Sequence, residues 1–211
     1  MSGLITAIRR EPGEPPRVAV FVDGRQAFTL PEDVLARLGL EVGTRLGAGE
    51  HERLDEASAS LEAREAALRL LAVRARTRSE LVGRLRRRGH AAAVIGAVVD
   101  GLAAAGLIDD RAFAELWTDE RMRLRPVGRR RLSQELRIRG VPPQVAEEVL
   151  DRAYGDNPER DLALRVARVR AKRSAGGPRS RERLYAFLVR RGFTRATAAE
   201  VVREVTGERD E

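Results

Sequence analysis

The chain has 211 residues, of which 34% are charged and 43% are hydrophobic. This composition is typical of folded, water-soluble proteins and excludes a disordered chain. The sequence contains no cysteine, which excludes disulfides and cysteine metal sites. No segment has the long apolar run of a signal peptide or a membrane span, so we expect a cytoplasmic protein that does not bind membranes.

The N-terminal residues predict a small β-rich region. Residues 17–30 alternate apolar side chains on both sides of Asp23-Gly24. This dipeptide supplies the positive φ angles of a type I′ turn, so the segment predicts a hairpin. Residues 4–9 are a candidate third strand, and the prolines of 11–16 (EPGEPP) predict a loop.

Helix-forming residues come after the hairpin. Residues 31–38 predict a short helix that has Pro31 in its first turn and ends at Gly39. From about residue 51 to 74 the sequence is rich in helix formers and predicts a longer helix that leads into the rest of the chain. We expect residues 1–50 to form a small cap on the helical part of the chain.

The rest of the chain contains three copies of one segment. LVGRLRRRGHAAAVIGAVVDGL (81–102) aligns without a gap with 132–153 and with 184–205. The spacings of 51 and 52 residues between copies indicate duplication. Four aligned positions keep one residue type in all copies: Leu81, Leu132 and Leu184; Leu85, Leu136 and Leu188; Gly89, Gly140 and Gly192; Val98, Val149 and Val201.

Capping residues predict where the helices of each copy begin and end. Thr77, Gly128 and Ser180 each lie four residues before an aligned leucine, and all are accepted N-cap types. Each aligned glycine falls where a helix must stop, and we expect it to adopt the left-handed conformation. With a variable first helix added, each copy becomes a three-helix repeat.

The predicted fold is therefore mainly α, with three tandem three-helix repeats in an elongated arc after the small cap that contains the hairpin. The predicted boundaries coincide with the repeats. They are the cap, 1–50; the helical linker and repeat 1, 51–108; repeat 2, 109–156; repeat 3, 157–207; and a tail, 208–211.

The sequence offers little for catalysis. His51 and His90 lie on a predicted linker and a predicted turn, without the partners of a catalytic or metal site. Lys172 lacks the glycine-rich loop of a nucleotide site. Asp109 and Asp110 precede a predicted helix, where N-capping is the expected role. We therefore expect no enzyme, no metal and no cofactor.

Sequence-specific DNA reading is not expected either. The second helix of the first copy (AAAVIGAVV) offers no donor or acceptor to base edges. Thr194, Arg195 and Thr197 of the third copy form the only chemically plausible reader. Phe113 and Trp117 share one helix face, so we expect core packing for both rather than base stacking.

The positive charge lies in the repeats. The formal net charge is +8, but residues 1–60 carry −3 and the remainder carries +11. Basic clusters on successive copies favour an extended anionic partner, which could be a phosphate backbone or an acidic protein groove. The candidate contact residues are Arg84, Arg86, Arg87, Arg88, Arg121, Arg123, Arg125, Arg129, Arg130, Arg131, Arg137, Arg139, Lys172, Arg173, Arg179, Arg190 and Arg191.

Several stretches resemble the RecX family of bacterial recombination regulators. They are ALRLLAVRARTRSELVGRLRRRGH, GLIDDRAFAELWTDERMRLRPVGRRRLSQELRIRGV and FLVRRGF. The resemblance covers about residues 61–206, and its most specific part runs from Gly106 to Gly140. VFVDGRQAFTL resembles the β-rich N-terminal extension found in a subset of that family.

The resemblance implies a non-enzymatic modulator of RecA, active in homologous recombination, DNA repair and the SOS response. Its repeats would lodge in the helical groove of the RecA–DNA filament, impede filament extension, and inhibit ATP hydrolysis and strand exchange. The implied partners are the RecA filament and, weakly and without sequence preference, single- or double-stranded DNA. In this interpretation the basic clusters contact acidic groups of RecA or the DNA of the filament.

Two other classes of protein remain open. One is a nonspecific DNA-binding helical-repeat protein, and the other is a structural helical adaptor. Binding governed by phosphates would weaken steeply with salt and would occur on naked DNA, which distinguishes the first class from a RecA-directed regulator. We expect a monomer, because no uncommitted apolar stripe is predicted to remain once the repeats are packed.

Overall fold

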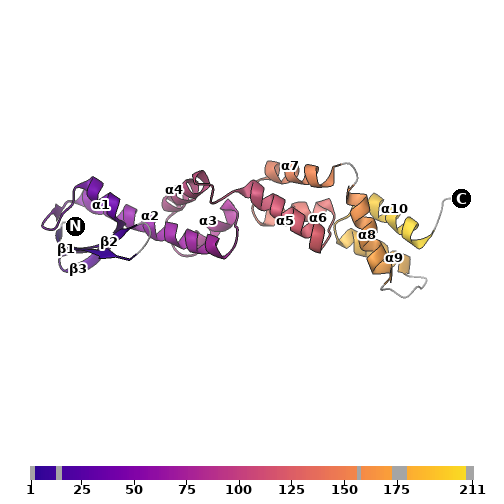
Figure 1. Cartoon of the computed structure of the whole chain (residues 1–211), viewed down its shortest axis with the longest axis horizontal. Coiled ribbons are helices and arrows are strands. Elements are labelled where there is room, and N and C mark those ends of the chain that lie inside the picture. Colours follow the sequence, from indigo (N-terminus) through magenta and orange to yellow (C-terminus); the bar gives the residue numbers. More distant parts are fainter. Residues whose placement is uncertain (1–2, 13–15, 156–157, 173–179, 208–211) are drawn as a thin grey trace. The chain divides into compact units, whose positions relative to one another are not determined.

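The computed structural model describes residues 3–12, 16–155, 158–172 and 180–207, and Figure 1 labels its helices and the first three strands. The described residues form four strands near the N-terminus and ten helices. The chain divides into two compact units, Met1–Ala75 with Leu81–Ile108, and Arg76–Glu80 with Asp109–Glu211. The predicted fold class, mainly α with a small antiparallel β region before helical repeats, is confirmed.

The first unit begins with an antiparallel sheet of strand order β3-β2-β1-β4. Its strands are β1 (Gly3–Glu11), β2 (Arg17–Val22), β3 (Arg25–Pro31) and β4 (Arg45–Leu46). Asp23 and Gly24 have φ angles of 49° and 81°, as a type I′ turn requires, which confirms the predicted hairpin. The candidate third strand, residues 4–9, lies within β1.

Two details of the sheet differ from the prediction. Glu11 pairs with Arg17 and is the last residue of β1, so the loop begins after it. Residues 13–15 of that loop lie outside the described residues. Strand β4 is not among the predicted elements, because two residues that pair with Gly3 and Leu4 are too few to show an alternating pattern.

Two helices complete the apolar core beneath the sheet. Helix α1 (Glu32–Leu38) confirms the predicted short helix and ends at Gly39, whose φ is 61°. Helix α2 (Ala48–Val73) is one continuous helix of 26 residues. Its Leu54 packs in the core of the sheet, whereas its Leu70 packs in the core of the first repeat. A single helix therefore connects the β region to the repeats.

Three helices make up each repeat, as predicted. The first repeat consists of α2, α3 (Arg78–Arg86) and α4 (Ala92–Ala104). The second consists of α5 (Asp110–Leu124), α6 (Arg129–Ile138) and α7 (Pro143–Tyr154). The third consists of α8 (Pro158–Lys172), α9 (Ser180–Arg190) and α10 (Arg195–Thr206).

Aligned residues have the same structural role in all three repeats. The aligned leucines and valines are all buried in the apolar cores. Gly89, Gly140 and Gly192 have φ angles of 89°, 74° and 89°, which confirms the predicted left-handed helix ends. Packing and backbone conformation therefore determine the aligned leucines, valines and glycines. What the chain binds is determined by residues on its surface.

The predicted N-caps are correct at two of the three positions. The Thr77 hydroxyl accepts the backbone N–H of Glu80 at 3.1 Å, and Gly128 is the N-cap of α6. Helix α9 begins at Ser180 itself rather than after it. Gly128 has no side chain to cap with, and Glu159 of α8 accepts the N–H of Arg129 at 3.1 Å instead.

One junction between middle helices occurs twice within the second unit, each time through a hydrogen bond to a main-chain carbonyl. The Thr77 hydroxyl donates to the carbonyl of Arg139 at 2.5 Å, and the N–H of Gly128 donates to the carbonyl of Arg191 at 2.9 Å. Thr77 aligns with Gly128, and Arg139 aligns with Arg191. In both cases the N-terminus of one middle helix therefore contacts the C-terminus of the next.

Glycine makes the close approach at these junctions possible. A Cβ added to Gly140 would lie 2.3 Å from Cβ of Ser79, and one added to Gly128 would lie 2.2 Å from the carbonyl carbon of Gly192. A Cβ at Gly89 would meet no heavy atom within 4 Å. The sequence indicates only the left-handed conformation of the aligned glycines, whereas the structure adds a spatial requirement at the two junctions.

Replacing Tyr154 by phenylalanine should lower the free energy of unfolding by about 1–3 kcal/mol. The Tyr154 hydroxyl donates to the carbonyl of Val127 at 2.7 Å in a buried site, and burial raises its pKa. The substitution leaves that carbonyl buried without its donor. Urea denaturation measures the effect, with Tyr185→Phe as the control, because Tyr185 is only half-buried. Equal unfolding midpoints for the two variants would contradict this role.

Candidate functional site

Many of the predicted contact residues are exposed and available to a partner. Within the described residues, their charged groups have no carboxylate partner and no other polar or ring contact. We call them the exposed cation set: Arg84, Arg86, Arg87, Arg88, Arg123, Arg125, Arg130, Arg137, Lys172 and Arg190. Arg173 and Arg179, also predicted, lie outside the described residues.

The densest part of this set lies where α3 ends. Helix α3 ends at Arg86, and Arg87 and Arg88 come next, in the turn that Gly89 closes. All three arginines are exposed, because the apolar face of α3 is directed into the repeat core through Leu85. Consecutive guanidinium groups on one turn are suited to contacting several anionic groups of an extended partner.

Arg129 is bound within the second repeat rather than exposed. Its guanidinium contacts Glu147 at 2.5 Å and Asp151 at 2.8 Å, both on α7. Partial burial alone would lower the pKa of Arg129, but the hydrogen bonds to these carboxylates outweigh it and raise the pKa. Much of its positive charge is therefore neutralised by the chain itself.

Two further predicted contact residues share one carboxylate. Glu135 of α6 pairs with Arg121 of α5 at 2.8 Å and with Arg131 at 3.3 Å. Glu135 also accepts the indole N–H of Trp117 at 3.3 Å. One half-buried acid therefore organises two cations and an aromatic ring between α5 and α6.

Trp117 packs against the core, as the sequence predicts, but it also has polar surroundings that the sequence does not indicate. Phe113 is buried as predicted, but Trp117 is only partly buried and lies parallel to Phe113 at 6.3 Å between ring centroids. The guanidinium of Arg139 lies 3.5 Å from the indole centroid, and that of Arg121 lies 4.8 Å from it. Arg139 also pairs with Glu80 at 3.3 Å. These cation–π and ion-pair contacts hold the indole ring in place.

Arg191 belongs to the second junction. It is half-buried, its guanidinium donates to the carbonyl of Pro126 at 2.9 Å, and it lies 4.9 Å from the ring of Phe187. Burial lowers its pKa, and the nearby charges of Arg131 and Arg125 lower it further. Its contacts therefore indicate a role in packing.

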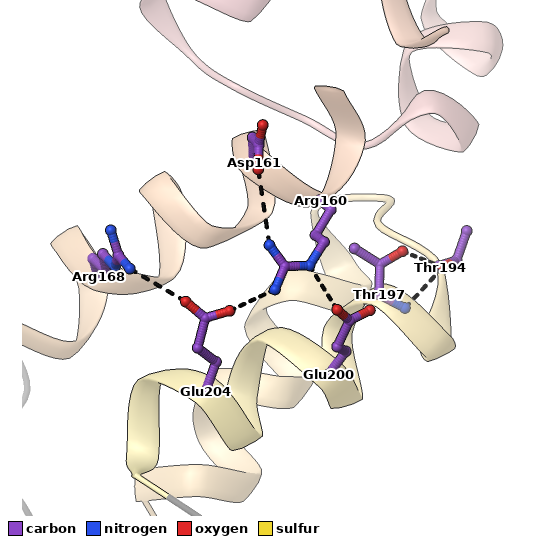
Figure 2. A network of polar contacts seen from close by, with 7 residues as sticks. All are labelled: Arg160, Asp161, Arg168, Thr194, Thr197, Glu200 and Glu204. Atoms are coloured by element: carbon purple, nitrogen blue, oxygen red, sulfur yellow. Dashed lines mark hydrogen bonds and ion pairs between the residues drawn. The ribbon is translucent and has the colours of Figure 1, made fainter. Parts of the chain in front are cut away.

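A polar network joins α8 to α10 in the third repeat (Figure 2). Arg160 contacts Glu200 at 2.6 Å, Glu204 at 2.7 Å and Asp161 at 3.8 Å, and Arg168 contacts Glu204 at 3.2 Å. The hydrogen bond to Glu200 is the largest cause of the raised pKa of Arg160. Glu200 and Glu204 lie four residues apart and therefore on one face of α10. This spacing is the sequence feature from which the network could have been predicted.

Figure 2 also shows Thr194 and Thr197, two of the three residues that formed the only plausible base reader. The Thr194 hydroxyl accepts the N–H of Thr197 at 3.1 Å, and the two hydroxyl oxygens lie 2.8 Å apart. Both hydroxyls are therefore engaged at the start of α10, and only Arg195 of this group is exposed with no such contact in the described chain. This arrangement leaves little for reading base edges.

Three of the groups considered for catalysis, Asp109, Asp110 and His51, are engaged in structural contacts. Asp109 accepts the N–H groups of Arg111 and Ala112, both at 2.9 Å, which confirms its capping role. Asp110 accepts the N–H of Arg78 at 2.8 Å at the start of α3. His51 packs edge-on against Phe28 at 4.9 Å between ring centroids. None of the described helices is long and apolar enough to span a bilayer.

Comparison with known proteins matches the first and second repeats to one family. The model of the first three-helix domain of RecX matches residues 63–102, and the model of its second three-helix domain matches residues 109–150. Two curated relatives named regulatory protein RecX are similar over most of their length. The one from Mycobacterium leprae is 41% identical over 71% of this chain and 89% of the relative, and the one from Mycobacterium avium is 41% identical over 74% and 91%.

Solved structures agree with the fold. A crystal structure of a regulatory protein RecX has a TM-score of 0.77 at 22% identity and covers 98% of this chain and 100% of its own. The structure of RecX from Lactobacillus salivarius has a TM-score of 0.64 at 23% identity and covers 72% of this chain and 99% of its own. With its three repeats, its two matched domains and relatives of this identity, the chain belongs to the RecX family.

Proposed function

We propose that this chain is a non-enzymatic regulator of RecA that binds the RecA–DNA filament in its helical groove. There it limits filament extension and inhibits ATP hydrolysis and strand exchange. This places it in the cytoplasm, in homologous recombination, DNA repair and the SOS response. Membership of a family whose curated members are named regulatory proteins supports the proposal.

The exposed cation set is the observation that carries the proposal. Its members come from α3, α5, α6 and the ends of α8 and α9, and they are not neutralised by the described part of the chain. A nucleoprotein filament presents an extended row of phosphates, which cations spread over several helices can contact at many points. The paired arginines, such as Arg129, contribute less because their charge is already compensated.

Strand exchange and ATP hydrolysis by the cognate RecA test this function. We expect the purified chain to slow both reactions when it is added in a substoichiometric amount relative to RecA. The reason is that blocking filament growth affects many RecA subunits at once. A RecA reaction that proceeds at its normal rate, with the chain folded and present in equal amount, would contradict the proposal.

A nonspecific DNA-binding protein is the second candidate, favoured by the consecutive exposed arginines Arg86, Arg87 and Arg88. Binding measured over a range of salt concentrations separates the two candidates. A regulator directed at the filament should bind the filament more tightly than naked DNA at each salt concentration, whereas equal affinities with the same steep salt dependence would favour the second candidate.

A further inference from the structure

The second repeat exposes large apolar side chains on α5 and α6. Leu116 and Leu124 of α5 are 66% and 60% exposed, and Ile138 of α6 is 75% exposed. Leu116 and Leu124 are eight residues apart, with Glu120 midway, so all three lie along one helix face. The second repeat therefore leaves apolar side chains uncovered, although Glu120 interrupts the face on which the two leucines lie.

A shallow groove lies beside Leu124. It is lined by Trp117, Glu120, Arg121, Leu124 and Arg125. The indole of Trp117 is held by Glu135 and Arg139, so it has little conformational entropy to lose when a partner binds. Tryptophan and arginine are the residue types that most often dominate the energetics of protein–protein contacts.

Apart from Arg125, the charged residues around the groove are either paired or negative, which favours a protein partner over a nucleic acid. Arg121 is paired with Glu135 and Arg139 with Glu80, so their attraction for a phosphate is largely compensated. Glu120 lines the groove and would repel a phosphate. Arg139 covers the indole at 3.5 Å, where a stacked base would have to lie. Exposed leucines, in turn, gain little from a phosphate backbone but are buried readily by another protein.

We propose that the exposed face of α5, defined by Leu116, Trp117, Leu124 and Arg125, is the docking surface for the RecA protein of the filament. Its partner chemistry is an apolar side chain flanked by carboxylates. The apolar side chain covers Leu124 and the part of the indole that lines the groove. Arg125 is exposed at the edge of the groove and supplies the cation that a flanking carboxylate would pair with. This inference rests on the proposed function, because it assigns the partner surface to RecA itself rather than to the DNA.

The double variant Leu116→Ser/Leu124→Ser tests the surface. Both side chains are exposed, so the variant should keep the melting temperature and helix content of the wild type. We expect its affinity for RecA filaments on single-stranded DNA to fall by about tenfold or more, as for central apolar contacts of an interface, and its affinity for naked DNA to stay unchanged. The matched control is Val42→Ser/Val73→Ser, whose valines are 60% and 78% exposed outside this surface.

The outcomes separate this inference from the function on which it rests. Wild-type protein that fails to bind RecA filaments would overturn the proposed function and this inference with it. Wild-type protein that binds filaments, with the leucine variant binding as tightly, would overturn this inference alone. An equal loss of binding to filaments and to naked DNA would also overturn it, because the surface would then be a DNA contact. Loss of filament binding alone, with the valine control unaffected, supports it.

Discussion

Replacing Gly128 by alanine will destabilise the second unit by about 3 kcal/mol, as severe overpacking does. The φ of Gly128 is −74°, which any residue can adopt. The loss of stability therefore reports the clash of the new Cβ and not backbone strain. The new Cβ would lie 2.2 Å from both the carbonyl carbon and the carbonyl oxygen of Gly192, and 2.3 Å from the nitrogen of Phe193. All three are main-chain atoms that cannot rotate away, so the junction itself must open.

Chemical denaturation followed by circular dichroism measures this loss. The control is Gly96→Ala in α4, where an added Cβ meets no heavy atom within 4 Å. Because Gly96 lies inside a helix, alanine there should raise the free energy of unfolding by about 0.5–1 kcal/mol. If Gly128→Ala unfolds at the same denaturant concentration as the wild type, the close approach at this junction is not required for stability.

Reversing Arg86, Arg87 and Arg88 to glutamate together will weaken binding to the RecA–DNA filament by more than tenfold at low salt, if each of the three arginines contacts an anionic group. These side chains have no carboxylate partner among the described residues, so their replacement leaves no buried charge behind. For binding to single-stranded DNA, the slope of log affinity against log salt should become shallower by about 2, at about 0.7 for each phosphate that is no longer neutralised. Fluorescence anisotropy at several salt concentrations measures both quantities.

A matched control distinguishes local contacts from net charge. Arg25, Arg45 and Arg53 are likewise exposed and lie in the N-terminal part of the chain. Reversing these three changes the net charge by the same amount and should leave binding within a few-fold of the wild type. Equal losses in the two triple variants would mean that overall charge, rather than the turn after α3, governs binding. The neighbouring Arg129, Arg130 and Arg131 are poorer targets, since Arg129 and Arg131 are bound by carboxylates.

Local patterns explain what the sequence could predict. The hairpin at Asp23-Gly24 and the left-handed conformation of Gly89, Gly140 and Gly192 depend on backbone preferences. A small number of neighbouring residues is enough to determine these preferences. The buried faces of the repeats result from helical periodicity, which is visible in one segment and repeats in the next. These features therefore agree between sequence and structure.

Contacts between distant segments explain what the sequence could not predict. Arg129 pairs with Glu147 and Asp151, and Arg139 pairs with Glu80, across separations that no local period encodes. Counting basic residues therefore overestimates the charge available to a partner, because the acids that compensate it lie on other helices. Strand β4 is missed for the same reason, since pairing across the sheet defines it.

The two junctions are made by main-chain groups and the Thr77 hydroxyl, with glycines that leave space for them, so they depend on few side chains. Substitutions on the solvent-facing sides of the helices can then accumulate without disturbing how successive middle helices meet. A family built on such junctions is free to diversify its contact chemistry over evolutionary time while conserving its architecture. Loss of one junction glycine, by contrast, would be selected against in any member that uses the same contact.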